Sequence, residues 1–268
     1  MSVNEAVDVG NVKLERFGAV AQLTLSRPNA LNAITWEMYQ QLEGHLKYLA
    51  NDTETRVLVI RGEGEKAFAA GTDIGQFKGF SGQDGIDYEA RIDSIVDQLA
   101  FFPKPTIAAV NGYAVGGGLL LSLACDLRYA TPKAKFGAPM ARTLGNCLSF
   151  NNYQRLVTEI GQMRTKELLY TAQVISAEEL FKVGALTAVL DQENFFEKVL
   201  ETATKITKNA PLTVNATKEA MIRINKNKRM NIPENAFHDV VSKVYGSRDF
   251  AEGVSAYLEK RSPEWVGE

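Results

Sequence analysis

The sequence predicts an α/β fold in which most strands pair in parallel. Segments with strand character alternate with segments with helix character through most of the chain, which is typical of parallel sheets crossed by helices. The strand signals then stop, and the C-terminal part is predicted to be helical. The 268 residues are 45% hydrophobic and 23% charged, a composition typical of a globular protein with one large core.

The N-terminal part is predicted to contain a β-hairpin followed by a helix. Residues 12–17 and 20–26 alternate apolar and polar side chains on either side of Gly18. The turn signal Arg27-Pro28-Asn29 ends the second strand. A helix is expected from the N-cap Thr35, because apolar side chains recur at helical spacing at Tyr39, Leu42, Leu46 and Leu49.

The middle of the chain continues this alternation. Residues 56–60 are predicted to form a short strand that ends at Gly62, and a glycine- and acid-rich loop is expected over residues 71–85. A buried strand is expected over residues 106–110, then a helix that starts at a run of glycines, and then a strand over residues 127–130. The helix between the loop and the buried strand is marked by Ile92, Ile95, Val96 and Leu99.

The C-terminal part is predicted to be a separate helical unit. Helices are expected over residues 195–210, 212–224 and 247–260. We therefore expect a core over residues 1–200 and a helical oligomerisation region over residues 201–268.

Residues 112–120 carry the clearest signal of a functional site. Three consecutive glycines remove the side chains from the first turn of a predicted helix, where backbone N–H groups lack intrahelical partners and the helix dipole is positive. Such a helix start suits an anion, or a carbonyl oxygen that becomes one. The alternative is that the glycines only let helix and strand pack closely.

A second candidate stretch is residues 66–73, where small side chains after a strand let a ligand approach the backbone. If the backbone N–H groups of Thr72 and Gly117 converge, they form a two-donor oxyanion hole that stabilises negative charge on a carbonyl oxygen. The alternative is a mobile surface loop.

Charge and composition argue against several other functions. The net charge of −2 gives no reason to expect binding of nucleic acid or of a membrane surface. The acidic N-terminus predicts neither a signal peptide nor a transit peptide. The two histidines, His45 and His238, lack partners at ligand spacing, so no metal site is expected. With Cys125 and Cys147 as the only cysteines, we expect a cytoplasmic protein.

Two motifs in this order point to a known family. Ala67-Phe68-Ala69-Ala70-Gly71-Thr72-Asp73 is followed by Asn111-Gly112-Tyr113-Ala114-Val115-Gly116-Gly117-Gly118. This pair resembles the signature of the crotonase (enoyl-CoA hydratase/isomerase) superfamily, and the resemblance covers nearly the whole chain. It implies a crotonase-like spiral of ββα units with a helical C-terminal trimerisation region. It also implies a homotrimer or a homohexamer.

The resemblance further implies an acyl-CoA thioester whose carbonyl oxygen is held by the N–H groups of Thr72 and Gly117. CoA is then part of the substrate, and no separate cofactor is expected. Tyr257 and Lys260 match positions that often reach CoA from a neighbouring subunit, although Lys260 fits a solvated helix end equally well. The full set that matches the family's CoA-contacting positions is Arg27, Asn29, Ala30, Leu31, Ala70, Tyr257 and Lys260.

The sequence departs from the family where hydratases carry two catalytic glutamates. The matching positions hold Leu120 and Met140, which cannot exchange protons, so hydration cannot run through them. Isomerisation, decarboxylation and thioester hydrolysis stay open, because they need the oxyanion hole but not that pair. In the polar stretch that follows, Cys147 is a candidate nucleophile and Ser149 a candidate for orienting water or a carboxylate. The alternative for both is helix capping and loop hydrogen bonding.

Two other classes of function are considered. The first is a non-catalytic binder of CoA thioesters that kept the scaffold and lost its acid and base. The second is a dinucleotide-binding oxidoreductase, because residues 62–67 match G-x-G-x-x-A just after a predicted strand. Glu63 and Glu65 would then face the pyrophosphate, which argues against this second class.

Overall fold

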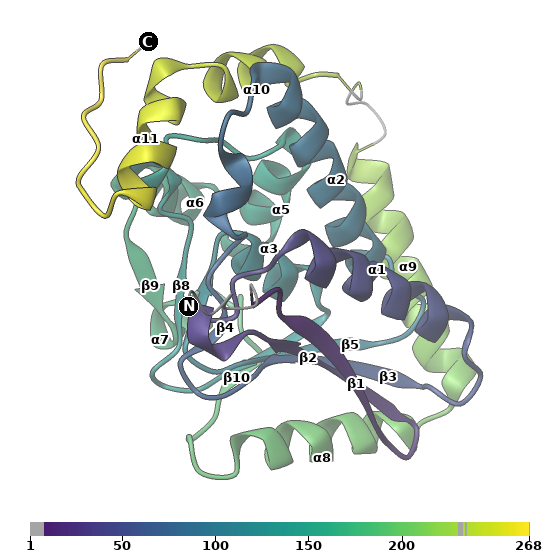
Figure 1. The fold of residues 1–268 in the computed structure, drawn as a ribbon. Coiled ribbons are helices and arrows are strands. Elements are labelled where there is room, and N and C mark those ends of the chain that lie inside the picture. Colours follow the sequence, from purple (N-terminus) through teal and green to yellow (C-terminus); the bar gives the residue numbers. More distant parts are fainter. Residues whose placement is uncertain (1–7, 230–232, 234, 268) are drawn as a thin grey trace, which may run out of the picture.

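The computed structural model describes residues 8–229, 233 and 235–267, and its strands form two sheets (Figure 1). The larger sheet has the strand order β1-β2-β3-β5-β7-β10 and the smaller one has the order β4-β6-β8-β9. Pairing is parallel except between β1 and β2 and between β8 and β9. The larger sheet contains β1 (Asn11–Phe17), β2 (Val20–Ser26), β3 (Val57–Gly62), β5 (Thr106–Val110), β7 (Leu127–Ala130) and β10 (Ala188–Val189). The smaller sheet contains β4 (Ala67–Ala69), β6 (Tyr113–Val115), β8 (Lys135–Gly137) and β9 (Val174–Ser176).

Consecutive strands are divided between the two sheets. The pairs β3 and β4, β5 and β6, and β7 and β8 each place the first strand in the larger sheet and the second in the smaller one. A helix follows each pair: α2 (Gly82–Ala100), α3 (Gly117–Ala124) and α4 (Met140–Thr143). Each turn of the chain is therefore a ββα unit, and successive turns form a spiral, which confirms the predicted fold class.

The N-terminal elements follow the sequence prediction. β1 and β2 form an antiparallel hairpin, and a short 3-10 helix, η1 (Pro28–Ala30), breaks the chain after β2. α1 (Trp36–Asn51) begins at Thr35, whose side chain accepts a hydrogen bond from the backbone N of Met38 at 3.2 Å. Thr35 is therefore the N-cap, as expected from the sequence.

α2 begins earlier than the sequence predicted. Residues 71–85 were expected to form a loop, but they contain the 3-10 helix η2 (Ile74–Phe77) and the first turn of α2. A capping box fixes this start: the side chain of Ser81 accepts from the N–H of Asp84, and the side chain of Asp84 accepts from the N–H of Ser81. The buried face of α2 is longer as a result and includes Gly85, Tyr88, Glu89 and Ile92.

α8 (Phe195–Thr207) covers the outer face of the larger sheet (Figure 1). Its buried side chains pack against sheet residues on β2, β3 and β5, and this second core consists of Phe195, Val199 and Ala203 with Val20, Val57, Val59, Ile107, Ala109 and Tyr129. The domain boundary expected after residue 200 falls inside this helix. Residues beyond position 200 are thus part of the core, because one continuous helix covers the sheet.

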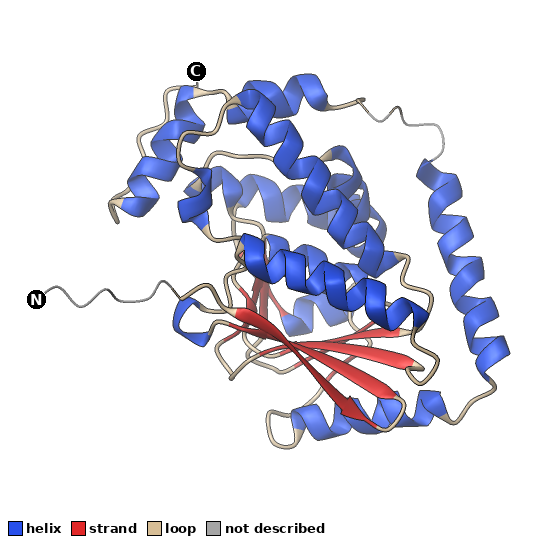
Figure 2. Cartoon of the chain, turned by 45° about the vertical axis from the view of Figure 1, so that its right-hand side comes forward, coloured by secondary structure: helices blue, strands red, loops and turns tan. Residues whose placement is uncertain are grey.

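The remaining helices lie on the other side of the larger sheet or at the edge of the molecule. α9 (Pro211–Arg229) lies at the right-hand edge of the molecule in Figure 2. Its Lys218 side chain is buried, and Lys218 Nζ lies 2.6 and 2.8 Å from the two carboxylate oxygens of Asp126. Within the described residues, no helix combines the length and the apolar character needed to cross a membrane. The other helices are α5 (Phe150–Ile160), α6 (Gln162–Thr171), α7 (Ala177–Lys182), α10 (His238–Tyr245) and α11 (Arg248–Leu258).

Phe195→Ala should lower the free energy of unfolding by about 3 kcal/mol, because a buried ring between α8 and the sheet would be replaced by a cavity. Urea denaturation measures the change. Glu201→Ala, on the exposed side of the same helix, is the matched control and should change stability by less than about 0.5 kcal/mol. Equal effects of the two substitutions would show that α8 is not packed on the sheet.

Candidate active site

The glycine run forms the start of α3 at the end of β6. Gly116 is the N-cap, with φ of 53°, and Gly117 and Gly118 are the first helical residues. A Cβ added to Gly118 would lie 2.1 Å from the carbonyl oxygen of Ala69. Close packing, the alternative expected from the sequence, is therefore the role of Gly118.

Gly117 faces a different neighbour, the loop that carries Thr72. A Cβ added to Gly117 would lie 2.7 Å from Tyr39 Oη and 3.8 Å from the backbone N of Thr72. In the parallel bridge between Ile34 and Thr72, Ile34 N donates to Gly71 O at 2.8 Å and Asp73 N donates to Ile34 O at 2.9 Å. These two hydrogen bonds use the carbonyl oxygen of Gly71 and the N–H of Asp73. The N–H of Thr72 is therefore left for another acceptor.

The first residue of a helix also has an N–H without an intrahelical acceptor. The N–H groups of Thr72 and Gly117 are thus available at neighbouring points, and both residues line one cavity. An oxyanion hole requires two such neighbouring donors.

Buried phenols hold the Thr72 loop in place. Thr72 Oγ1 lies 2.9 Å from Tyr39 Oη and 2.8 Å from Tyr88 Oη. Burial raises the pKa values of both tyrosines above the ordinary value, so both phenols are neutral. The three hydroxyl groups therefore form a neutral hydrogen-bonded chain beside the backbone of Thr72.

The cavity in front of these donors, here called the acyl cavity, has a volume of about 220 Å³. Leu120 and Met140 line it, and both side chains are buried. Ala70 and Tyr257 also line it, so Tyr257 reaches the cavity of its own chain. Most of the remaining lining side chains are apolar, among them Ile74, Phe77, Ile92, Val115, Leu144 and Leu148.

The other residues expected to contact CoA are not among those that line this cavity. Ala70 N donates to Leu31 O at 3.1 Å, which joins the two predicted segments. Arg27 Nη1 lies 2.5 Å from Asp73 Oδ2, so its guanidinium ties these loops together within the chain. Four residues of the expected set are exposed, namely Asn29, Leu31, Tyr257 and Lys260, and Ala30 is partly exposed.

Cys147 and Ser149 do not line the acyl cavity, contrary to expectation. The Cys147 thiol is buried, and burial, with a smaller contribution from nearby Glu89, raises its pKa to about 12, which opposes nucleophilic use. Ser149 is the N-cap of α5 and accepts from Asn152 N at 3.2 Å. Helix capping, the alternative considered above, is the role that the structure gives Ser149.

Glu89 is a site residue that the sequence analysis missed. It lines the acyl cavity from α2 and is only 4% exposed. Glu89 Oε2 accepts from Ser149 N at 2.6 Å, and Glu89 Oε1 accepts from Tyr245 Oη at 2.6 Å. Burial raises the pKa of this carboxyl to about 8, despite these two hydrogen bonds, which act to lower it.

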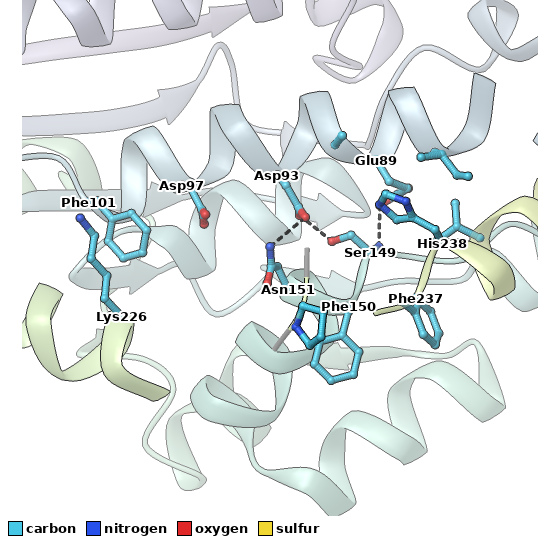
Figure 3. Close-up of a pocket in the computed structure, with 14 residues that line it drawn as sticks. Glu89, Asp93, Asp97, Phe101, Ser149, Phe150, Asn151, Lys226, Phe237 and His238 are labelled. Atoms are coloured by element: carbon cyan, nitrogen blue, oxygen red, sulfur yellow. Dashed lines mark hydrogen bonds between the residues drawn. The ribbon is translucent and has the colours of Figure 1, made fainter. Parts of the chain in front are cut away.

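Glu89 also lines a second cavity of about 540 Å³ (Figure 3). Asp93, one turn further along α2, lies at this cavity and accepts from Ser149 Oγ at 2.5 Å and from Asn151 Nδ2 at 3.2 Å. Burial raises the pKa of Asp93 to about 6. Among the described residues that line the two cavities, Glu89 is the one that they share.

The spacing of apolar residues in α2 contains a signal for Glu89. Tyr88, Ile92, Ile95 and Leu99 define one helical face, and Glu89 lies next to Tyr88 and three residues before Ile92 on that face. An acidic residue on an apolar helix face is rarely buried without a reason.

The G-x-G-x-x-A match does not have the structure of a dinucleotide site. Residues 62–67 lead from β3 into the strand β4, whereas the nucleotide motif opens a helix. Glu63 is paired with Lys13, with Nζ and Oε2 2.8 Å apart.

Comparison with known proteins establishes the family. The enoyl-CoA hydratase/isomerase family model matches residues 15–268, and the chain therefore belongs to the enoyl-CoA hydratase/isomerase (crotonase) family. It is 34% identical to a short-chain-enoyl-CoA hydratase of Clostridium acetobutylicum, over 96% of this chain and 98% of that one. It is 33% identical to a crotonyl-CoA hydratase of Syntrophomonas wolfei, with the same two coverages, 96% and 98%.

Solved structures show the same fold. A methylmalonyl-CoA decarboxylase in complex with 2-nitronate-propionyl-CoA has a TM-score of 0.87 and 29% identity, over 96% of this chain and 99% of that one. An enoyl-CoA hydratase from Bacillus anthracis has a TM-score of 0.75 and 33% identity, over 96% and 100%.

Glu89→Gln should make the stability of the protein less sensitive to alkaline pH. With a folded pKa of about 8 and an unfolded one near 4.3, the folded protein holds a proton that the unfolded chain releases. The resulting stabilisation is complete below about pH 4 and is lost as pH rises toward 8, by about 1.4 kcal/mol per pH unit.

Chemical denaturation at about pH 6.5, 7.5 and 8.5 tests this expectation, because Asp93 titrates mostly below this range. The wild type should lose stability along the series and the Glu89→Gln variant should lose less. A variant with the wild-type slope would contradict the raised pKa of Glu89.

Proposed function

We propose that this protein transforms an acyl-CoA thioester through an enolate. The thioester carbonyl oxygen would lie between the N–H groups of Thr72 and Gly117, which supply the hydrogen bonds that stabilise its developing charge. The observation that carries this proposal is the approach of Gly117 to Thr72 at one wall of the acyl cavity. Relatives named as acting on CoA thioesters support it.

Hydration of an enoyl thioester is disfavoured at this site. It needs groups that deliver and remove protons as water adds across the double bond. Leu120 and Met140, which line the acyl cavity, have no such groups, so Glu89 would have to serve alone as the base for water and the acid for the substrate. The buried side chains of Leu120 and Met140 also keep the cavity apolar, which strengthens electrostatic interactions with the oxyanion donors.

Among the remaining reactions, decarboxylation of a 2-carboxyacyl-CoA fits the site best. Loss of CO₂ leaves its electron pair in the enolate, so the step needs an oxyanion hole but no base. An apolar cavity disfavours a localised carboxylate more than the delocalised enolate. The methylmalonyl-CoA decarboxylase structures with the same fold are consistent with this assignment.

A non-catalytic binder of CoA thioesters is the alternative from another class. It would bind an acyl-CoA with saturable affinity and release no product. Turnover measurements therefore separate it from the enzyme.

We also propose that the chain associates into a trimer or hexamer. α9 exposes apolar side chains, with Leu212 82%, Met221 50% and Ile224 48% exposed, and a second subunit could cover them. Light scattering at micromolar concentration should give a multiple of the 29.5 kDa chain mass. A monomeric mass would contradict this proposal.

The wild type should release CO₂ from malonyl-CoA or its 2-methyl derivative and should hydrate crotonyl-CoA poorly. Gly117→Ala should lower CO₂ release by about 100-fold, because the added methyl group would meet Tyr39 Oη at the oxyanion hole. Gly44→Ala, at a helical glycine with open space around it, is the matched control and should keep the wild-type rate. Rapid crotonyl-CoA hydration, or binding of all these thioesters without product, would overturn the assignment.

A further inference from the structure

We infer that Glu89 is the catalytic residue that moves the proton at carbon 2 of the acyl group, supplied by α2 in place of the glutamates that are missing from α3 and α4. The inference rests on the proposed enolate chemistry but not on which bond of the substrate is broken. It assigns a role to a buried carboxyl group for which the mechanism otherwise has no use.

The position of Glu89 carries the argument. It lines the same acyl cavity as Thr72 and Gly117, so it borders the space that an enolate would occupy. Among the described residues that line this cavity, it is the one with a carboxyl group, and none is a histidine or a lysine. Glu89 is therefore the ionisable side chain best suited to exchange a proton with the acyl group at neutral pH.

The hydrogen bonds around Glu89 suit both of its protonation states. As a carboxylate, it accepts from Ser149 N and from Tyr245 Oη, each at 2.6 Å. As an acid, its O–H can donate to Tyr245 Oη, because the tyrosine hydroxyl has a second acceptor, Cys147 O, at 3.4 Å. Both carboxyl oxygens have a hydrogen-bond partner in either state. Glu89 can therefore be protonated and deprotonated without a change in packing.

The second cavity supplies a path for that proton. Glu89 lines both the acyl cavity and the larger cavity drawn in Figure 3, whose walls carry polar as well as apolar side chains. Water in the larger cavity can restore the proton without entering the acyl cavity.

The chemical step balances with these groups alone. When a 2-carboxyacyl thioester loses CO₂, the pair from the broken carbon–carbon bond forms the C1–C2 double bond, and the carbonyl π pair moves to oxygen. The Glu89 acid then gives its proton to C2, and the enolate pair forms the new C–H bond. Glu89 is left as a carboxylate and takes a proton from water.

Hydrogen–deuterium exchange at C2 of butyryl-CoA tests the inference, because this saturated thioester reports proton transfer with no bond to carbon broken. The wild type in D₂O should exchange one of the two C2 hydrogens, measured by mass spectrometry, because Glu89 removes and returns the proton on one face. Glu89→Gln should slow exchange by at least about 100-fold, while the affinity for butyryl-CoA, measured by calorimetry, stays within about threefold of the wild-type value. Asp87→Asn is the matched control, because Asp87 is an exposed carboxyl on the same helix that lines neither cavity. It should exchange within about threefold of the wild-type rate.

The pH profile of the wild type gives a second readout that does not depend on a variant that folds. Exchange requires the Glu89 carboxylate as base, so the rate should rise with pH and level off above about 8. Titratable groups that surround or neighbour Glu89 are Tyr39, Tyr88, Asp93, Cys147, Tyr153, His238 and Tyr245. Burial raises the pKa values of Cys147 and Tyr153 to about 12 and raises those of Tyr39, Tyr88 and Tyr245 above the ordinary value, so these groups stay neutral through this range.

Two results would overturn the inference. One is a Glu89→Gln variant that exchanges at the rate of the wild type. The other is an exchange rate of the wild type that does not change between about pH 6 and 9. The proposed reaction fails separately. Exchange by the wild type without CO₂ release would refute decarboxylation and leave the role of Glu89 intact. CO₂ release by the wild type, together with C2 exchange that Glu89→Gln does not change, would support decarboxylation and refute the role of Glu89.

Discussion

The approach of the first turn of α3 to the Thr72 loop is the constraint on which the site depends. Side chains at Gly117 and Gly118 would collide with Tyr39 Oη and with the carbonyl oxygen of Ala69. The same absence of side chains that allows this packing leaves the backbone N–H groups open to the cavity. The proposed oxyanion binding therefore uses the same contact as the close packing, although the sequence offered the two as alternatives.

The surrounding polar groups serve mainly to keep that contact in register. Arg27 binds Asp73 beside the Thr72 loop, and Tyr39 and Tyr88 bracket the hydroxyl of Thr72. Buried polar groups of this kind are costly unless all are paired, so the network favours one arrangement of the loop. Arg27 thus shapes the region expected to receive CoA by holding two loops together.

The local elements were predictable, and the contacts between distant segments were not. The hairpin, the Thr35 cap and the strand over residues 106–110 depend on neighbouring residues, which a single sequence displays. Glu89 was missed because the apolar residues that marked the helix began at Ile92 and its partners lie far along the chain. Ser149 is 60 residues away and Tyr245 is 156 residues away. Periodicity likewise predicted α8 as a helix, but it cannot say whether the apolar face meets its own sheet or another subunit.

The two hydrogen bonds that fix Glu89 also bear on the chirality of the product. An enolate is planar, and a substituent on C2 makes its two faces non-equivalent. In its inferred role, a single acid held on α2 by Ser149 N and Tyr245 Oη presents its proton to one of these faces. A branched acyl-CoA made here would therefore carry one configuration at C2 even when its precursor is racemic, because the stereocentre is lost in the enolate and rebuilt from one side.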